Sequence, residues 1–512
     1  MINEEKTYLP YADERRIDFE AIFELVDVDA STTATATGSK GTFFSMPFQT
    51  HDKISYMTRK IATSEPNEWK LDGSFFLIKE NLDNDEIGYW SDALSDEDGN
   101  IETHLYFEFA TRQTSRGITV IFDDRTENYA TDFKVIAYGT TDNVIAETTV
   151  TGNESYMASA DMLAEKYKKL EIIFTKTNKP KRRIRVVEVV FGYLRAFNND
   201  DIVSLNVDYE TSLYGNTLPT NRLSLTIDNS DRRYNIINPT GIYRYLQKGQ
   251  GINASVLMGG NRVQLGRFYF DSSRSDDNSM AVTITAYDKI YLLSDAKISV
   301  GGTGTWTLAQ AVKAIVKASN VSISTYIDPE IAGRVIGRGI PPNTTVREAL
   351  RLVAQAARCI CYFNRVDILS FVEPKIGDVV DYLDNDKMAQ LPTISDTGLI
   401  NSVEIEARND YDENAEEKVY KAQNIAIDEE ERKISISNPC VISDDVAKWV
   451  LNLCRYRITY NITERGNPAR ELIDTVNVAD IYGENRNGIT LRQSVKGGKG
   501  LSGELEVVTD YE

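Results

Sequence analysis

The stretch RIDFEAIFELVDVDA, residues 16–30, alternates apolar and mostly charged side chains. Side chains on a strand point alternately to its two faces, so the apolar positions of this stretch share one face. Those positions are Ile17, Phe19, Ala21, Phe23 and Leu25. The pattern predicts one long antiparallel strand that is buried on one face. A lone strand cannot fold by itself, so its partners must lie elsewhere in the chain.

Short alternating runs, separated by turn residues, recur through residues 31–195 and predict a β-sandwich. The runs are His104–Phe109, Ile118–Phe122, Asp132–Tyr138, Val144–Val150, Lys169–Thr175 and Arg183–Phe191. Within this region only Ser159–Tyr167 fits a short helix of two turns.

Residues 196–296 are again rich in alternating runs, such as Arg222–Asp228, and predict a second set of strands. The next part, 297–375, contains two capping boxes, Thr307–Gln310 and Thr345–Glu348. Each capping box precedes apolar residues at helical spacing, so we expect two helices in a small α/β module.

The last part, 376–512, returns to strands, among them Ser402–Ala407 and Thr475–Ala479. A helix over Asp444–Arg455, with Ser443 as its N-cap, is the one expected interruption. The fold class predicted from the whole chain is therefore mainly β, and α+β overall.

Composition excludes several classes of function. The chain has 512 residues, with 77 acidic and 57 basic side chains and a formal net charge of −20. A protein that binds duplex nucleic acid needs a basic footprint, so we expect no sequence-specific nucleic-acid binding. The sequence shows no secretion signal and no apolar stretch of membrane-spanning length, so we expect no membrane insertion and folding in a cytoplasm.

Residues that commonly carry catalysis or bind metals are few. The chain has only two histidines, His51 and His104, and neither lies near a recognisable catalytic triad pattern. The four cysteines, Cys359, Cys361, Cys440 and Cys454, are expected to be reduced and packed. Residues 498–503 match a dinucleotide-binding glycine pattern but lack the helix that must follow it. We therefore expect no catalytic residues, no metal and no cofactor.

Two charged clusters have competing interpretations. Acidic residues between Asp83 and Asp98 offer oxygen ligands for calcium. Their spacing does not match the fixed ligand positions of an EF-hand loop, so a solvated surface is the preferred interpretation. Basic residues between Lys176 and Arg185 suit a phosphate, an anionic glycan or an acidic neighbouring subunit, but a charged hairpin tip is the preferred interpretation.

Two stretches resemble a known family. Residues 61–75, IATSEPNEWKLDGSF, with Gly88–Ser91, resemble the inserted sandwich of tail and baseplate-hub proteins from phages of Gram-positive bacteria. That sandwich is similar to the discoidin, or galactose-binding-like, fold. Residues 223–236, LSLTIDNSDRRYNI, resemble the tube-building part of the same baseplate hub, or tail-tip, family of phage tails and contractile injection systems.

The resemblance implies a four-part organisation. Residues 1–30 with 196–296 would form a first tube-like β-barrel, and 31–195 an inserted discoidin-like, jelly-roll β-sandwich. Residues 297–375 would form the small α/β module, and 376–512 the second tube-like β-barrel.

The resemblance also implies a function without enzymatic activity. Three copies would form a homotrimeric ring that adapts a six-fold tail tube to a three-fold spike and lines the central channel. The implied partners are the tail tube protein, a spike or tail-tip hydrolase, baseplate wedge proteins and the tape measure protein. The implied location is the baseplate of a virion, or of an extracellular bacteriocin-like particle, assembled in the host cytoplasm.

Two alternatives stay open at this point. A tail-associated cell-wall hydrolase is one, although such proteins usually append a separate catalytic domain. The other is a glycan-binding adhesin that acts through the sandwich. For it, Tyr89 and Trp90 are the candidate carbohydrate-binding residues, because aromatic rings stack on sugars, although a core position is the commoner role of such rings.

Overall fold

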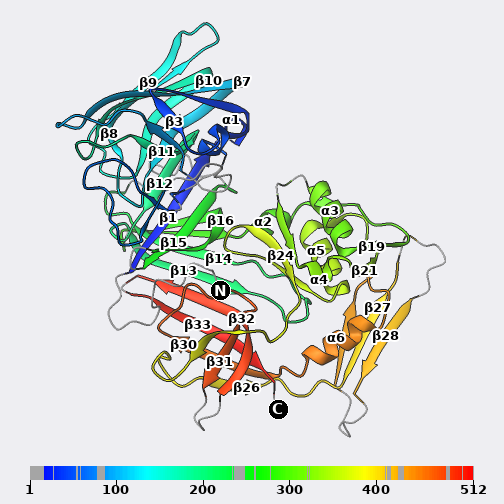
Figure 1. The fold of residues 1–512 in the computed structure, drawn as a ribbon. Coiled ribbons are helices and arrows are strands. Elements are labelled where there is room, and N and C mark those ends of the chain that lie inside the picture. The colour runs from blue at the N-terminus through cyan, green and yellow to red at the C-terminus, as the bar shows by residue number, and fades with distance from the viewer. Residues whose placement is uncertain are drawn as a thin grey trace. The chain divides into compact units, whose positions relative to one another are not determined.

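The structure is a computed structural model of the chain (Figure 1). It describes residues 17–26, 28–52, 56–57, 59–77, 87–232, 234–235, 248–258, 261–276, 278–319, 321, 323–409, 411, 417–424, 432–479, 485–498 and 500–510. The fold is mainly β, as the alternating pattern predicts. The chain divides into two compact units, of which one is Phe23–Arg195 and the other comprises Met1–Ile22 with Ala196–Glu512.

The first alternating stretch forms β1 (Ile17–Val26), which lies between β12 (Gly192–Phe197) and β15 (Gly251–Met258) in a sheet. The prediction of one solvated face is wrong, because Glu20 and Glu24 on the charged face are also buried. Glu20 forms an ion pair with Arg262, which compensates the carboxylate for lost water. The strand also ends earlier than predicted, since a short helix α1 (Val28–Thr33) follows it.

Among its described residues, the unit Phe23–Arg195 contains an eight-stranded sheet in the order β3-β6-β11-β7-β10-β8-β9, with β2 also paired to β7. Its strands are β2 (Ala34–Ser39), β3 (Gly41–Phe43), β6 (Tyr89–Ser91), β7 (Asn100–Phe122), β8 (Ala130–Tyr138), β9 (Val144–Val150), β10 (Met157–Thr177) and β11 (Arg185–Val190). Two further short strands, β4 (Lys60–Ile61) and β5 (Phe75–Phe76), pair with each other in parallel.

The long strands β7 and β10 organise the core of this unit. Shifts of register interrupt their pairing, and such bulges let a strand bend around a core. That core is rich in aromatic rings, including Phe107, Phe122, Phe174 and Phe191. The short helix expected over Ser159–Tyr167 is wrong, because these residues belong to β10 and pair with β7.

The other unit contains a 13-stranded sheet among the described residues, in the order β12-β1-β15-β16-β17-β14-β13-β32-β33-β30-β26, with β31 on β32 and β25 on β31. Besides β1 and β12, its strands are β13 (Ile202–Glu210), β14 (Arg222–Asp228), β15 (Gly251–Met258), β16 (Asn261–Asp276), β17 (Ala281–Tyr287), β25 (Val379–Leu383), β26 (Thr393–Asp396), β30 (Ile458–Glu464), β31 (Thr475–Ala479), β32 (Asn485–Gly497) and β33 (Ser502–Thr509).

Strands from two distant parts of the sequence meet at the pair β13 and β32. They run antiparallel, with Leu205 opposite Gly497 at one end and Glu210 opposite Arg492 at the other. The side chains of Ser494 and Asn206 add a hydrogen bond of 3.0 Å, and those of Arg492 and Glu210 an ion pair of 3.0 Å. This pairing makes one sheet of the strands in 196–296 and the strands near the end of the chain.

The remaining elements form an α/β part of the same unit (Figure 1). Its helices are α2 (Ile290–Leu293), α3 (Leu308–Ser319), α4 (Pro329–Ala332), α5 (Val346–Ala356) and α6 (Asp445–Leu453). Its strands are β18 (Lys297–Ile298), β19 (Thr305–Thr307), β20 (Ser324–Ile327), β21 (Val335–Gly337), β22 (Thr344–Thr345), β23 (Ile360–Phe363), β24 (Ile368–Val372), β27 (Ser402–Ala407), β28 (Lys418–Gln423) and β29 (Lys433–Ser437).

One hydrophobic core connects the two sides of the predicted boundary at residue 375. Leu308 on α3 and Leu350 on α5 belong to the same buried cluster as Val403 on β27 and Val446 on α6. The predicted boundary therefore does not separate two cores here, and the four-part division remains a prediction.

The helix caps match the sequence in part. Thr307 and Gln310 exchange both hydrogen bonds of a capping box. The hydroxyl of Thr345 accepts a hydrogen bond from the backbone N–H of Glu348. The Glu348 carboxylate forms an ion pair with Arg351 instead of the second hydrogen bond of a capping box, which would go to the backbone N–H of Thr345. The prediction of Ser443 as an N-cap is wrong, because α6 begins one residue later, with Asp444 at the N-cap position.

Asp288 is a buried carboxyl group at the turn from β17 to α2. Its two oxygens accept hydrogen bonds from the backbone N–H groups of Asn221 and Ile290, each 3.1 Å long. Burial raises the pKa of Asp288 to about 7, and the nearby Asp367 adds to the rise, while the two backbone hydrogen bonds and Arg347 oppose it. The folded state thus prefers the protonated form of Asp288.

We predict that Asp288 makes stability fall as pH rises. Because its pKa in the folded state is above the unfolded value of 3.8, its contribution is fully present below about pH 4 and is lost as pH rises through 7. The loss amounts to at most about 4 kcal/mol. Urea unfolding of the wild type and of Asp288→Asn between pH 4 and 8 measures it. The wild-type free energy of unfolding should fall relative to that of the variant, and a difference independent of pH would contradict the prediction.

Candidate functional site

A cavity of about 320 Å³ opens on the unit Phe23–Arg195. Its walls come from three parts of the fold: strand β3, the segment that follows β4, and the end of β6 facing the start of β11. The lining residues are Thr42, Phe44, Ala62, Thr63, Ser64, Trp90, Ser91, Asp92 and Arg183. The cavity therefore combines hydroxyl groups, one carboxylate, one guanidinium group and two aromatic rings.

The two rings predicted to bind carbohydrate are both buried, and only one of them lines the cavity. Trp90 is 2% exposed, and its indole N–H donates to the carbonyl oxygen of Ile87 at 3.0 Å. The Trp90 ring packs edge-on against Phe44, with 5.4 Å between the ring centroids. Neither Tyr89 nor Trp90 presents an open ring face for stacking, so their role in sugar binding remains a prediction.

Tyr89 is a core residue of the unit. Its hydroxyl donates to the carbonyl oxygen of Ser39 and shares a hydrogen bond with Thr103, both 2.8 Å long. The ring lies against the backbone of Gly38 and Gly41, where a Cβ atom on Gly38 would come within 2.2 Å of a ring carbon. A side chain at that glycine would therefore displace Tyr89.

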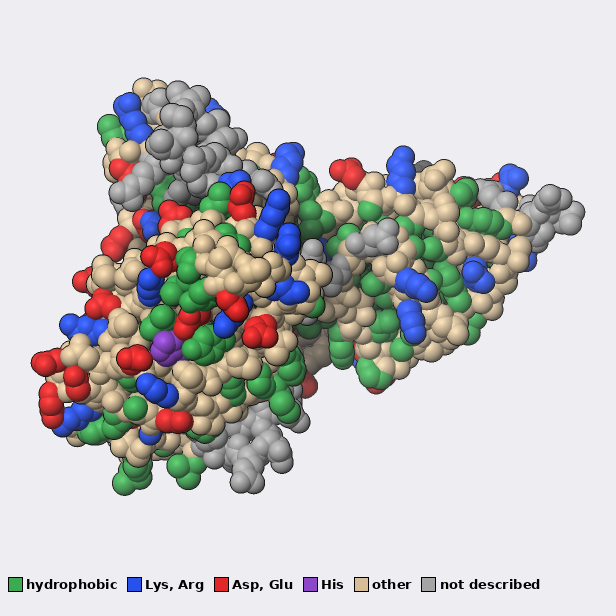
Figure 2. Space-filling model, turned by 90° about the horizontal axis from the view of Figure 1, so that it is seen from above, with side chains coloured by type: hydrophobic (Ala, Val, Ile, Leu, Met, Phe, Trp, Pro, Cys, Tyr) green, Lys and Arg blue, Asp and Glu red, His purple; other side chains and the backbone are tan. Residues whose placement is uncertain are grey.

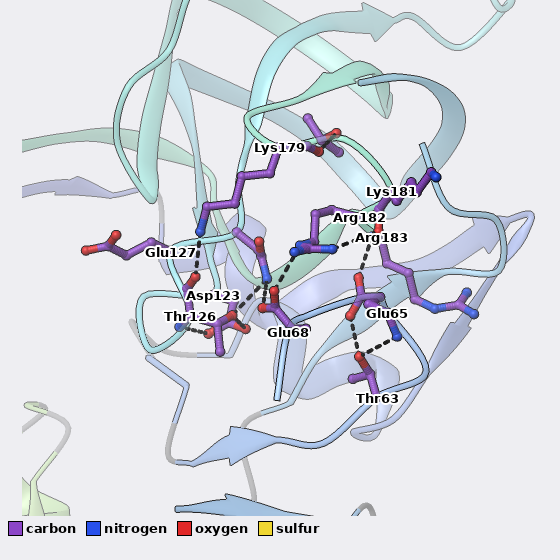
Figure 3. A network of polar contacts seen from close by, with 12 residues as sticks. Thr63, Glu65, Glu68, Asp123, Thr126, Glu127, Lys179, Lys181, Arg182 and Arg183 are labelled. Carbon is purple, nitrogen blue, oxygen red and sulfur yellow. Dashed lines mark hydrogen bonds and ion pairs between the residues drawn. The ribbon is translucent and has the colours of Figure 1, made fainter. Parts of the chain in front are cut away.

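Two lining residues of the cavity, Thr63 and Arg183, are hydrogen-bonded to a cluster of charged side chains (Figure 3). Its centre is Arg185, whose side chain is fully buried and forms ion pairs with Glu65 and Asp123, the latter at 2.7 Å. Glu68 lies 3.7 Å from Arg185 and forms a second ion pair of 2.9 Å with Arg182. The Arg185 guanidinium also lies over the Trp90 ring, 4.4 Å from its centroid.

Electrostatics keep Arg185 charged in spite of its burial. Burial alone lowers the pKa of Arg185, but the carboxylates of Asp123 and Glu65 outweigh burial and raise the pKa. The same Glu65 accepts a 2.6 Å hydrogen bond from the backbone N–H of Arg183 and a 2.5 Å bond from the hydroxyl of Thr63. The cluster therefore holds two lining residues, Thr63 and Arg183, in place.

Most of the residues around this cavity were not among the binding residues predicted from the sequence. The preferred interpretation of the basic cluster as a hairpin tip is wrong for Arg185, which is fully buried, although Lys181 is exposed and pairs with Glu97. The run RIRVVEVV, residues 183–190, places Arg185 among apolar residues, and that pattern is a signal of burial. Asp92 belongs to the acidic patch, of which 83–86 lie outside the described residues.

Cysteine and histidine side chains are the few candidates for reactive or metal-binding groups in this chain. No group of three or more His, Cys, Asp or Glu side chains among them is arranged to hold a metal ion. All four cysteines are free, and burial raises the pKa of the Cys361 thiol to about 12, which leaves it unreactive. Burial also lowers the pKa of His51, which favours the neutral form of its ring. No helix in the described part of the chain is sufficiently long and apolar to span a membrane.

Comparisons with known proteins found no matching family model and no matching curated protein. Among solved structures, the chain is similar to a tail protein from Neisseria meningitidis, with 14% identity and a TM-score of 0.45 over 61% of this chain and 93% of that chain. It is similar to a 43 kDa prophage tail protein from Shewanella oneidensis, with 17% identity and a TM-score of 0.44 over 61% and 94%. It is also similar to a fucose-binding module from Streptococcus pneumoniae, with 19% identity and a TM-score of 0.17 over 20% and 72%.

We predict that Arg185→Met destabilises this unit by about 3–5 kcal/mol, because it leaves buried carboxylates without their partner. Urea unfolding followed by circular dichroism and tryptophan fluorescence measures the loss. The matched control is Arg112→Met on the exposed part of β7, which should change the free energy of unfolding by less than about 0.5 kcal/mol. Equal effects of the two substitutions would show that the cluster does not stabilise the fold.

Proposed function

We propose that this chain is a structural subunit of a phage tail or phage-tail-like particle, and that it is the hub that joins the tail tube to the spike. The observation that carries the proposal is the pairing of β13 with β32, which makes one extended sheet from two strand-rich parts of the chain. A conduit wall needs such a sheet, because the ladder of backbone hydrogen bonds resists separation of the strands. The resemblance of residues 223–236 to the tube-building part of hub proteins supports the same function.

Symmetry explains why two strand-rich parts would be useful in one chain. If each part takes the place of one tube subunit, three copies of the chain present six such parts. A closed ring of three identical chains then matches a six-fold tube on one side and a three-fold spike on the other. In this proposal the partners are the tube protein, the spike or its hydrolase, baseplate wedge proteins and the tape measure protein, and the location is the baseplate.

In the described part of the chain, the sheet of this unit ends in the exposed strand β26, which supports the proposed pairing of subunits. All four residues of β26 are exposed, and Ile394 on it is 50% exposed. The strand is paired on one side, to β30. Edge strands carry unpaired backbone donors and acceptors, which makes them sites for pairing with another chain.

The acidic excess of the chain fits a conduit for DNA in this proposal. Acidic and basic side chains are interspersed on the face shown in Figure 2, so the excess is not gathered into one patch on that face. We propose that acidic side chains line the channel of the ring, where they would repel DNA and let it slide. In a bacteriocin-like particle no DNA would pass, and this charge would have no such role.

We predict three copies of the chain at the end of the tail tube. Cryo-electron microscopy of intact particles measures the copy number and the position. Six copies, or a position at the periphery of the baseplate, would overturn the hub proposal, because neither arrangement adapts six-fold to three-fold symmetry.

A matched pair of variants tests the edge strand in the same particles. Ile394→Lys adds a charge to β26 and should lower the amount of this chain in assembled particles, because a charged edge strand resists pairing. Val419→Lys on β28 is the control, since Val419 is 45% exposed but lies in a different sheet. Equal incorporation of both variants would exclude β26 from the ring contacts.

We predict no cell-wall hydrolysis by the purified chain, in contrast to the alternative of a tail-associated hydrolase. Incubation with purified peptidoglycan, followed by assay of released reducing ends, measures it. The control is lysozyme on the same substrate. Release above background that follows the protein through purification would show that the chain is an enzyme.

A further inference from the structure

Lys289, at the turn from β17 to α2, is the only lysine in the described part of the chain that is buried, and it is 8% exposed. Its ammonium nitrogen Nζ lies 5.6 Å from the ring centroid of Tyr269 and 5.8 Å from that of Phe363. Lysine side chains are almost never fully buried unless they are paired, because a buried charge loses its water. The partner of Lys289 therefore decides what this side chain does.

That partner is Asp367, in the turn between β23 and β24. Its carboxylate oxygen Oδ2 forms an ion pair with Nζ of Lys289 and accepts a 2.9 Å hydrogen bond from the hydroxyl of Tyr269. The other oxygen, Oδ1, is buried and accepts no hydrogen bond from the described residues. A buried carboxylate oxygen without a donor is unfavourable, since it has lost water and gained no partner. The ion pair alone leaves this oxygen uncompensated.

Both members of the pair are held by their own turns. Asp288, the residue before Lys289, accepts two backbone hydrogen bonds of 3.1 Å that fix the first turn. In the second turn, the backbone N–H of Asp367 donates to the carbonyl oxygen of Asn364 at 3.1 Å. Groups held in reactive geometry behave as if their concentration were about 10⁵–10⁸ M. The fold thus brings an amine and a carboxyl group together without a further entropy cost.

We propose that Lys289 and Asp367 become joined by an isopeptide bond in the folded chain. The ammonium group first gives one proton to Oδ1, which yields a neutral amine and a neutral acid. The lone pair of Nζ then attacks the carboxyl carbon Cγ and forms the N–C bond. The bond from Cγ to Oδ1 breaks, and Oδ1 leaves as water with a second proton from Nζ. One ammonium and one carboxylate give one amide and one water, with no oxidant or cofactor.

The surroundings favour the amide over the ion pair. Two buried charges are replaced by a neutral group, which is less unfavourable in an environment with little water. The oxygen that lacks a donor is the one that leaves, and Oδ2 stays as the amide oxygen that accepts from Tyr269. Negative charge develops on Oδ2 during the attack, and the Tyr269 hydroxyl stabilises it. Tyr269 is therefore the catalytic residue of this step.

The bond would be a covalent clamp inside the larger unit. It would join the turn after β17 to the turn between β23 and β24, and so close a loop over residues 289–367. A cross-link reduces the conformational freedom of the unfolded chain, as a disulfide does. The strands of 196–296 and the α/β part would then stay connected when the chain is pulled or partly unfolded.

Mass spectrometry of the purified full chain tests the proposal. The intact denatured chain should be lighter than its sequence mass by one water molecule. Trypsin does not cleave after an acylated lysine, so the digest should contain residues 275–297, uncut at Lys289, joined to residues 366–375. Fragmentation of the joined peptides places the link at Lys289 and Asp367.

An exposed ion pair in the same chain is the internal control. Nζ of Lys248 lies 3.2 Å from Asp271, but the Lys248 side chain is 74% exposed. Water solvates both charges there, so no link should form and trypsin should cleave after Lys248.

Two variants separate the bond from the ion pair. Lys289→Arg keeps the positive charge but has no amine to acylate, so the variant should have its full sequence mass and yield no joined peptide. Tyr269→Phe removes the hydroxyl at Oδ2 and should slow formation of the bond on the order of 100-fold. The linked fraction at fixed times after cell-free synthesis measures the rate, and circular dichroism verifies that each variant is folded.

The wild-type result decides the proposal even if a variant fails to fold. Folded wild-type chain with its full sequence mass, with trypsin cleavage after Lys289 and with peptide 366–375 unmodified would show that the pair is only an ion pair. A joined peptide in folded Lys289→Arg would place the link at another residue and also overturn the proposal. Neither outcome depends on the copy number in a particle, so the hub proposal stands or fails separately.

Discussion

The backbone hydrogen bonds between β13 and β32 are the interaction on which the larger unit depends. They join residues 205–210 to residues 492–497, and the whole α/β part lies between them in the sequence. Closing such a long loop costs conformational entropy, which the pairing and the cores on both sides must offset. Without this pair, each of the two sets of strands would have an additional open edge, and open edges favour aggregation.

The smaller unit depends on a different constraint, the pairing of a fully buried arginine. Moving the charged Arg185 side chain from water into the core is unfavourable unless carboxylates pair with its guanidinium group. Glu65, Glu68 and Asp123 provide those carboxylates. The segment that carries Glu65 and Glu68 has little regular secondary structure, so ion pairs rather than strand pairing hold it. Glu65 in this cluster also bonds Thr63 and the backbone of Arg183, which line the cavity.

Local patterns predicted many strands correctly, because alternation is a property of neighbouring residues. The predicted bounds of Arg222–Asp228, Ser402–Ala407 and Thr475–Ala479 coincide with β14, β27 and β31. The prediction failed over Ser159–Tyr167, where sheet pairing with β7 decided the conformation. It failed for Glu20 on β1 as well, since the sequence of a strand does not reveal that both of its faces will be covered.

By itself the sequence determined the fold class, the positions of most strands and the capping of α3 by Thr307, since all of these follow from residues within a few positions of one another. Only the tertiary structure decided which strands pair, that Arg185 is buried, and that Asp92 and Arg183 meet at one cavity. The physical reason is the separation along the chain of the residues that interact. Period-two alternation and capping are local interactions, whereas burial, ion pairing and cavity shape arise from contacts between segments far apart in the chain.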